Sequence, residues 1–258
     1  MALNAPSWLM ASPIAHRGLH DTRRGIIENT LGAAEAAAAR GNAIECDVQA
    51  SADGEAFAFH DDTLDRLTLS SGPLFQKTAT EIRTVRFRQG AEGVPTLVEL
   101  LQRLAGRTPL ICEIKSAFDG DMRLARRVAQ IAADYSGPLA LKSFDPAIIA
   151  YFREGANAPG PSGRPCPLGI VAEANYNGEY WRGLSGKQKT DFANFLHYPE
   201  TRPDFLSYCV DDLPHAIPFL LRTLNATPVM VWTVRTPAQR RLAAQWADQI
   251  VFEGELES

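Results

Sequence analysis

Short apolar runs alternate along the chain with longer segments in which apolar residues recur at helical spacing. The runs predict nine strands, over residues 13–16, 43–48, 56–60, 109–114, 139–144, 168–171, 205–209, 228–234 and 249–252. The intervening segments predict helices over residues 30–40, 97–104, 122–134, 146–153, 187–196, 214–224 and 237–246. This alternation is typical of parallel α/β proteins, and a chain of 258 residues is close to the usual size of one TIM (β/α)8 barrel, about 250 residues. We therefore predict this fold class.

Two features depart from a plain eightfold alternation. Nine strand candidates exceed eight, so we expect one of the middle ones, around Leu168 or Phe205, to be irregular. The segment 61–94 is rich in Thr, Ser, Gly and Arg, and it predicts a small insertion after the third strand. We expect residues 1–258 to form a single barrel domain that carries this insertion.

The composition is that of a globular chain without a dominant charge. Hydrophobic residues make up 45% and charged residues 22%, which excludes intrinsic disorder. Lys and Arg total 26 against 30 Asp and Glu, a net charge of -4, so no overall field favours nucleic acid as a partner. Residues 1–13 have no Lys, no Arg and no signal-like apolar run, so we expect a cytoplasmic protein without stable membrane association. We expect buried free thiols at the scattered cysteines, Cys46, Cys112, Cys166 and Cys209.

Acidic residues interrupt two of the predicted strands at alternate positions. Glu45 and Asp47 share one face of their strand, and Glu113 and Lys115 share one face of another. In a closed barrel these side chains project inward near the C-terminal mouth, where the active sites of TIM barrels lie. Carboxylates without accompanying Cys or His ligands suit Mg²⁺ or Ca²⁺. Alternatively, Glu45 or Asp47 pairs with Lys115 or Arg17 as a buried ion pair.

Two histidines close predicted strands near these acids. His16 and His60 each follow an apolar run, a position that favours a general acid and a general base over purely structural roles. Arg17 can grip a planar anion with two hydrogen bonds, and Lys115 adds a second positive charge. A metal, two histidines and two cations together indicate a phosphorylated substrate.

The remaining polar and aromatic candidates have two readings each. Glu28 can bind metal or substrate at the mouth, whereas the adjoining Asn29 and Thr30 can simply cap a helix. Trp232 is a core residue unless it faces inward, where it becomes a wall for the substrate. The other histidines are expected to be surface or packing residues, namely His20, His197 and His215.

These residues fall in motifs that closely resemble the glycerophosphodiester phosphodiesterase family. The motifs occur in the family's order and with family-like spacing. They are IAHRG from Ile14, ENT from Glu28, IECDV from Ile44, DGEAFAFHDDTLDRLT from Asp53, VPTLVELL from Val94, CEIK from Cys112 and VWTV from Val231. A single one of them would be weak support, but together they are very specific.

The resemblance implies a TIM barrel that hydrolyses a small-molecule glycerophosphodiester to glycerol 3-phosphate and an alcohol, using one divalent cation, Mg²⁺ or Ca²⁺. It implies an acid/base pair, His16 and His60, and three metal ligands, Glu45, Asp47 and Glu113. It also implies residues that bind substrate and phosphate, namely Arg17, Lys115, Glu28 and Trp232. The end of the chain departs from the family, whose last strand is commonly followed by Asp, whereas Glu253 stands here.

Two other functions stay open at this stage. A phospholipase of similar fold would act on a lysophospholipid or phosphoinositide, although no strongly apolar loop adjoins the motifs. A catalytically silent barrel would only bind a phosphorylated polyol, although no expected catalytic position is substituted. The leaving alcohol, the roles of the two histidines and the oligomeric state are left open by the sequence.

Overall fold

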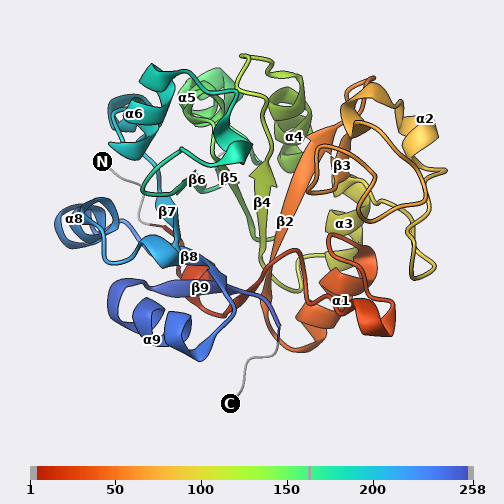
Figure 1. Ribbon diagram of the computed structural model, residues 1–258, viewed down its shortest axis with the longest axis horizontal. Coiled ribbons are helices and arrows are strands. Elements are labelled where there is room, and N and C mark those ends of the chain that lie inside the picture. The colour runs from red at the N-terminus through yellow and green to blue at the C-terminus, as the bar shows by residue number, and fades with distance from the viewer. Residues whose placement is uncertain (1–4, 162–163, 255–258) are drawn as a thin grey trace.

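Eight parallel strands close into a ring at the centre of the computed structural model, which describes residues 5–161 and 164–254 (Figure 1). In ring order they are β1 (Ile14–Ala15), β2 (Ala43–Ala50), β4 (Leu110–Ile114), β5 (Leu139–Ser143), β6 (Leu168–Ala172), β7 (Phe205–Cys209), β8 (Val229–Val234) and β9 (Gln249–Phe252). β9 pairs in turn with β1, which closes the ring. The predicted TIM (β/α)8 barrel is confirmed.

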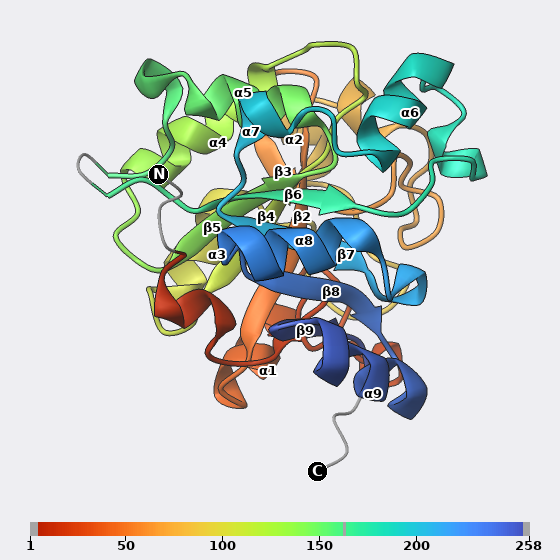
Figure 2. The same ribbon diagram turned by 90° about the vertical axis from the view of Figure 1, so that its left-hand side faces the viewer.

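Helices cover the outside of the ring in both views (Figures 1 and 2). They are α1 (Leu31–Ala39), α3 (Leu97–Leu104), α4 (Arg123–Ala133), α5 (Pro146–Arg153), α6 (Gly186–Ala193), α8 (Ala216–Asn225) and α9 (Pro237–Trp246), with two short helices, α2 (Ala79–Ile82) and α7 (Tyr198–Thr201). Most start at a residue whose side chain accepts a hydrogen bond from the first helical turn, as Thr96 does from Glu99 N. In the part of the chain described, no helix is both long and apolar enough to cross a membrane.

The ninth predicted strand lies outside the ring. β3 (Ala56–Ala58) pairs antiparallel with β2, with Val48 opposite Ala58. The link between the two strands is a tight turn through Gly54, which has a φ of 89°. A connection this short cannot contain a crossover helix, so the chain returns as a hairpin. The expectation of an irregular strand near Leu168 or Phe205 is therefore wrong, because β6 and β7 are regular members of the ring.

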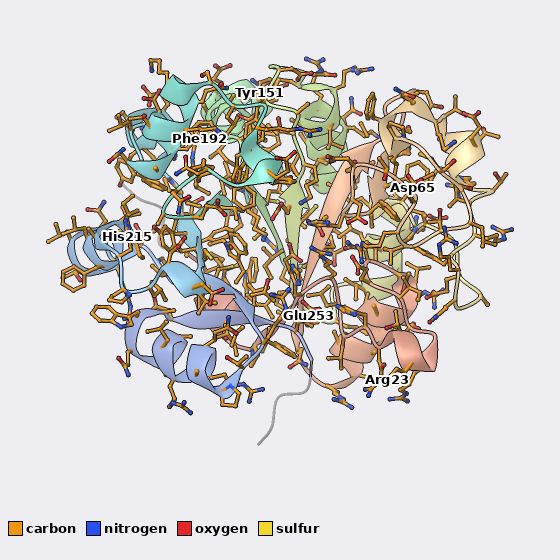
Figure 3. The ribbon with its side chains drawn as sticks, viewed as in Figure 1. Arg23, Asp65, Tyr151, Phe192, His215 and Glu253 are labelled. Carbon is orange, nitrogen blue, oxygen red and sulfur yellow. The ribbon has the colours of Figure 1, made fainter. Side chains whose placement is uncertain are left out.

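The predicted insertion after β3 packs on that hairpin. It contains α2 and two isolated bridges, Thr63 with Pro73 and Thr68 with Phe87. Its apolar side chains form a small cluster of their own with Ile27 and the β3 hairpin, made of Ile27, Phe57, Phe59, Leu64, Leu74, Ile82, Val85, Phe87 and Val94. Asp65 marks this insertion on the outer side of the molecule, far from α8 (Figure 3).

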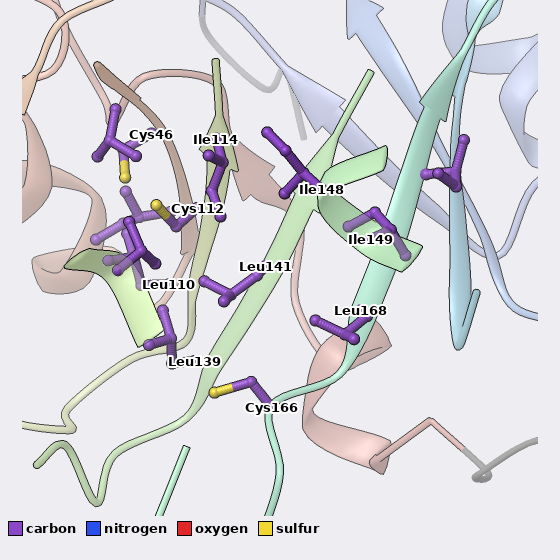
Figure 4. Close-up of a cluster of buried hydrophobic side chains, with 14 of the residues drawn as sticks. Cys46, Leu110, Cys112, Ile114, Leu139, Leu141, Ile148, Ile149, Cys166 and Leu168 are labelled. Carbon is purple, nitrogen blue, oxygen red and sulfur yellow. The ribbon is translucent and has the colours of Figure 1, made fainter. Parts of the chain in front are cut away.

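Alternation along the strands divides the core into two layers. Outward residues such as Cys46, Cys112 and Leu141 pack between the ring and the helices (Figure 4). Inward residues fill the half of the ring that lies near the N-terminal ends of the strands, and Leu9 packs against them. These inward residues are Ile14, Ala43, Ile111, Ala140, Phe205, Met230 and Val251. Gly169 is needed in this layer, because a Cβ there would lie 2.3 Å from the ring of Phe205. All four cysteines are free thiols; three are buried and Cys209 is half-buried.

His197 is a buried packing residue that makes stability depend on pH. It precedes α7, and its ring centroid lies 4.5 Å from that of Phe195. Burial disfavours the charged imidazole and lowers the pKa of His197 from 6.5 to about 4, although the nearby charge of Asp191 acts in the opposite direction. The unfolded chain therefore takes up a proton near pH 6.5 that the folded chain resists until about pH 4.

We expect acidification from pH 7 to 4.5 to destabilise the wild-type protein more than His197→Gln, by up to about 3 kcal/mol. The glutamine cannot take up a proton, so the variant lacks this contribution to the pH dependence. Urea unfolding of both proteins at several pH values measures the difference. Parallel stability curves would contradict the assignment of a neutral buried imidazole.

Candidate active site

Three carboxylates meet inside the ring near the C-terminal ends of its strands, which we call the mouth. One oxygen from each of Glu45, Asp47 and Glu113 lies within 4.8 Å of the others, and all three residues are buried. Asp47 and Glu113 are register partners on β2 and β4, and Glu45 stands two residues earlier on the same face. The period of two along a strand therefore brings together the three acids that the sequence predicts.

This donor set fits a hard divalent cation. Ca²⁺ binds oxygen at about 2.3–2.6 Å and Mg²⁺ at about 2.0–2.1 Å, so two oxygens on one ion lie at most about 4–5 Å apart. The spacing of at most 4.8 Å among Glu45, Asp47 and Glu113 meets that limit. Carboxylate oxygens are also the ligand type that both ions prefer.

Two lysines are interleaved with the acids. Lys115 Nζ lies 3.1 Å from Asp47 Oδ1 and 3.0 Å from Glu113 Oε1. Lys142 Nζ, on β5, lies 3.0 Å from both Glu45 Oε1 and Glu113 Oε2. Asp47 thus forms the buried ion pairs with Lys115 and Arg17 that the sequence offers as an alternative to a metal site, and the three acids also lie together.

Opposite charges shift the pKa values of Asp47 and Lys115 toward their charged forms. Burial alone would raise the pKa of Asp47, but the charges of Lys115, His60, Arg17 and His16 outweigh it and place the pKa well below its ordinary value. Burial alone would likewise lower the pKa of Lys115, yet Asp47 and Glu113 hold it above its ordinary value.

A tight turn after β1 aims the backbone of Arg17 into the cluster. Arg17 has a φ of 56° and Gly18 a φ of 77°, both left-handed. A Cβ on Gly18 would lie 2.7 Å from the backbone of Ala33 in α1, so glycine is required at this close approach. The turn points the Arg17 amide at Glu45, and Arg17 N donates to Oε2 at 3.1 Å.

Two carboxylates, those of Glu28 and Asp47, contact the guanidinium of Arg17. Nη1 donates to Glu28 Oε1 at 2.6 Å, and Nε lies 3.4 Å from Asp47 Oδ2. Among the described residues this Nε is one of the few buried side-chain nitrogen or oxygen atoms without a hydrogen bond. Glu28 also accepts from both terminal nitrogens of Arg66, at 2.9 and 2.8 Å, so it lies behind Arg17 and outside the cluster of three acids.

Asn29, one of the two capping positions that the sequence offers, does not cap the helix. Thr30 caps α1, because its side chain accepts from Ala33 N. Asn29 instead turns toward β2, where its Nδ2 donates to Asp47 Oδ2 at 3.0 Å and its Oδ1 accepts from Asp47 N at 3.1 Å. This amide holds the Asp47 side chain in place.

His16 follows β1 and faces Glu253, which follows β9. Its Nδ1 lies 3.3 Å from Glu253 Oε2, and the same carboxylate receives Arg235 Nη2 at 2.6 Å. The hydrogen bond with His16 and the charge of Arg235 lower the pKa of Glu253 to about 2. His20, expected to be an ordinary surface or packing residue, also lies at this carboxylate, 3.9 Å from Oε1.

His60, the second predicted histidine, follows the hairpin of β2 and β3. Phe59 N donates to Asp47 O at 3.0 Å, which brings the end of β3 over the acid cluster. His60 Nδ1 then lies 2.9 Å from Asp61 Oδ1, and Arg66 Nη2 donates to the same oxygen at 2.9 Å. His60 therefore does not close a strand of the ring, as the sequence suggested, but reaches the mouth from its side.

Aromatic side chains form the opposite wall. Trp232 lies on the inward face of β8, where its Nε1 donates to Ser207 O at 3.1 Å and its ring meets Phe144 edge-on, with 5.5 Å between the ring centroids.

Beside Lys115 a cavity of about 520 Å³ opens between the insertion and the segment that precedes α6, and its lining includes Phe75 and Tyr180. Both rings are exposed, Phe75 by 58% and Tyr180 by 55%.

Sequence reasoning missed Lys142 and Glu253. Lys142 stands two residues after Ala140 on β5, and Ala140 faces the ring interior. The alternation along a strand could therefore have predicted a buried, inward-facing lysine. Glu253 could not have been paired with His16, because the two are 237 residues apart and only the β1 and β9 pairing brings them together.

Known proteins match both the sequence and the fold. The profile of the glycerophosphoryl diester phosphodiesterase family matches residues 16–252. A glycerophosphodiester phosphodiesterase of Caldanaerobacter subterraneus subsp. tengcongensis is 35% identical over 111 residues, which are 40% of this chain and 44% of that protein. The aligned part is thus less than half of the relative's length.

Two solved structures share the barrel. An Oleispira antarctica phosphodiesterase in complex with the product sn-glycerol-3-phosphate has a TM-score of 0.71 at 20% identity, over 94% of this chain and 92% of that one. A glycerophosphodiester phosphodiesterase of Thermotoga maritima has a TM-score of 0.68 at 20% identity, over 93% and 94%. The family profile spans the first histidine, all three acids and the last strand of the ring, so the chain belongs to the glycerophosphoryl diester phosphodiesterase family.

Proposed function

We propose that this protein hydrolyses glycerophosphodiesters to glycerol 3-phosphate and an alcohol, with a divalent cation and two histidines as acid and base. The observation that carries the proposal is the meeting of Glu45, Asp47 and Glu113 in a buried cluster at the mouth of a barrel of this family. The product named for the Oleispira relative, sn-glycerol-3-phosphate, agrees with this reaction.

Glu45, Asp47 and Glu113 would hold the cation, Mg²⁺ or Ca²⁺, by one oxygen each. When bound, such an ion supplies Lewis acidity that polarises a phosphoryl oxygen and stabilises the charge that develops at phosphorus. Asn29 would keep Asp47 oriented through its two hydrogen bonds.

Arg17 and Lys115 would bind the phosphate. Arg17 offers a buried Nε that has no hydrogen bond among the described residues, and Glu28 orients the guanidinium by accepting from Nη1. The side chain of Lys115 is 14% exposed and borders the 520 Å³ cavity, so its ammonium can be reached from the mouth.

His16 and His60 would move the protons. In each ring Nδ1 faces a carboxylate, Glu253 or Asp61, which leaves Nε2 for the substrate. One histidine takes the proton from the attacking oxygen, which belongs to water or to the neighbouring hydroxyl of the substrate. The other histidine donates a proton to the leaving alcohol.

Trp232 would form the wall against which the substrate lies, since its ring stands on the inward face of β8. A second candidate substrate class follows from the exposed rings of Phe75 and Tyr180 beside Lys115. Such rings can contact an acyl chain, so a lysophospholipid is the alternative that the assay must include.

The test uses purified protein that has been stripped of metal with a chelator. Glycerophosphocholine and other diesters are supplied with and without Mg²⁺ or Ca²⁺, and glycerol 3-phosphate is measured by a coupled assay. We expect release that depends on added metal and that exceeds turnover of micellar lysophospholipid. Turnover of the lysophospholipid alone would replace the proposed substrate class, and binding without turnover of any substrate would overturn the enzymatic function.

A further inference from the structure

Lys142 is a buried cation that the proposed chemistry does not use. It is 2% exposed, whereas the side chain of Lys115 is 14% exposed. Lys142 is the register partner of Glu113 on the neighbouring strand β5. From there its Nζ reaches Glu113 Oε2 and Glu45 Oε1, both at 3.0 Å. The ammonium thus lies between oxygens of two proposed metal ligands and out of the reach of the substrate.

The described residues leave no carboxylate oxygen of the cluster without a partner. The oxygens not taken by Lys142 contact Lys115, Arg17 or Asn29. Three carboxylates therefore face Lys115, Lys142 and Arg17, which is shared with Glu28, so positive charges offset most of their negative charge. A cluster whose charge is offset in this way attracts a divalent cation less than three unpaired carboxylates would.

We propose that Lys142 competes with the divalent cation for Glu45 and Glu113 and thereby sets the metal affinity of the site. This inference rests on the proposed metal site. An ion bound to Glu45 and Glu113 would share these two carboxylates with the ammonium, and two positive charges on the same carboxylates repel each other strongly when little water screens them. Lys142 therefore opposes metal binding, either by occupying a ligand oxygen or by repelling the ion from the other oxygen of the same carboxylate.

The same contact would hold the cluster together in the absence of metal. Buried acids with no counter-charge would repel each other or take up protons. Lys142 joins Glu45 of β2 to Glu113 of β4 and so keeps the two side chains in place for the ion. Lys142 would thus lower the metal affinity of the site and, in the absence of metal, hold Glu45 and Glu113 in place.

The experiment measures metal binding in the absence of substrate. Mg²⁺ and Ca²⁺ are titrated by calorimetry into metal-free wild type, Lys142→Met and Lys142→Gln. We expect both variants to bind at least about 10-fold more tightly than the wild type, because one competing charge has been removed. We also expect their melting temperatures to be lower without metal and to rise more on its addition. Lys187→Met is the matched control, since it removes a lysine from an exposed ion pair with Asp191.

The outcomes separate this inference from the proposed function. In variants that are folded without metal, unchanged or weaker binding would overturn the role of Lys142, while metal-dependent diester hydrolysis by the wild type would stand. Variants that stay unfolded at saturating metal would also overturn it, because the ion could not replace the lysine. A variant that folds only with metal supports the inference. Absence of metal binding in the wild type and in both variants would overturn the metal site itself.

Discussion

Replacing either His16 or His60 by alanine is expected to lower kcat for glycerophosphodiester hydrolysis by about 10²- to 10⁴-fold. Proton transfer by a positioned imidazole acts in the transition state, so KM is expected to change much less than kcat. The fold should survive, because both rings lie at the mouth and neither belongs to a buried apolar cluster. Steady-state kinetics at saturating metal, with circular dichroism as a check of folding, measures both effects.

His215→Asn is the matched control for these two variants. His215 stands at the start of α8, where its Nδ1 accepts from Ile217 N, and asparagine preserves such a cap. Figure 3 places His215 toward the outside of the molecule and Glu253 near its centre. We expect this control to retain wild-type turnover. Near-normal turnover in both His16→Ala and His60→Ala would refute the assignment of the acid and the base.

Asp47→Asn is expected to weaken binding of the divalent cation by at least about 10²-fold. Removing a residue that only orients a metal ligand costs up to about 10²-fold in metal affinity, and removing a ligand itself should cost at least as much. We also expect the metal-free variant to be less stable by about 3 kcal/mol, near the lower cost of breaking a buried ion pair. The variant leaves the positive charges of Lys115 and Arg17 without this partner, although the amide oxygen can still accept one hydrogen bond. Calorimetric titration and urea unfolding without metal measure the two effects.

Asp134→Asn removes an acid from an exposed position at the end of α4 and is the control for charge. Its metal affinity and stability should match the wild type. Wild-type metal affinity in Asp47→Asn would show that Asp47 is not a ligand. Wild-type stability in the metal-free variant would show that the cations do not depend on this carboxylate.

The parts of the site that lie along single strands are predictable because a strand has a fixed period. Glu45, Asp47 and Glu113 alternate with Cys46 and Cys112, so their shared inward face follows from the chain alone. The motifs around them also identified the family, which the match over residues 16–252 confirms. The roles of His16 and His60 remain predictions.

The contacts between strands could not be predicted in the same way. β3 has the apolar character of a ring strand, and only the tight turn after β2 makes it a hairpin. That hairpin nevertheless joins Phe59, the neighbour of His60, to the backbone of Asp47, so a strand outside the ring contributes to the mouth. The sequence therefore predicts the extra strand in the wrong part of the chain, near β6 or β7 instead of at β3.

By itself the sequence determined the alternation of strands and helices, the inward face of each acidic strand and the family, because these depend on local periods and short motifs. Only the tertiary structure decided which charges neutralise one another. Closing the ring puts Glu253 against His16 across 237 residues, and the register of β5 puts Lys142 between two acids. Electrostatic energy depends on distance in space, and strand pairing sets those distances.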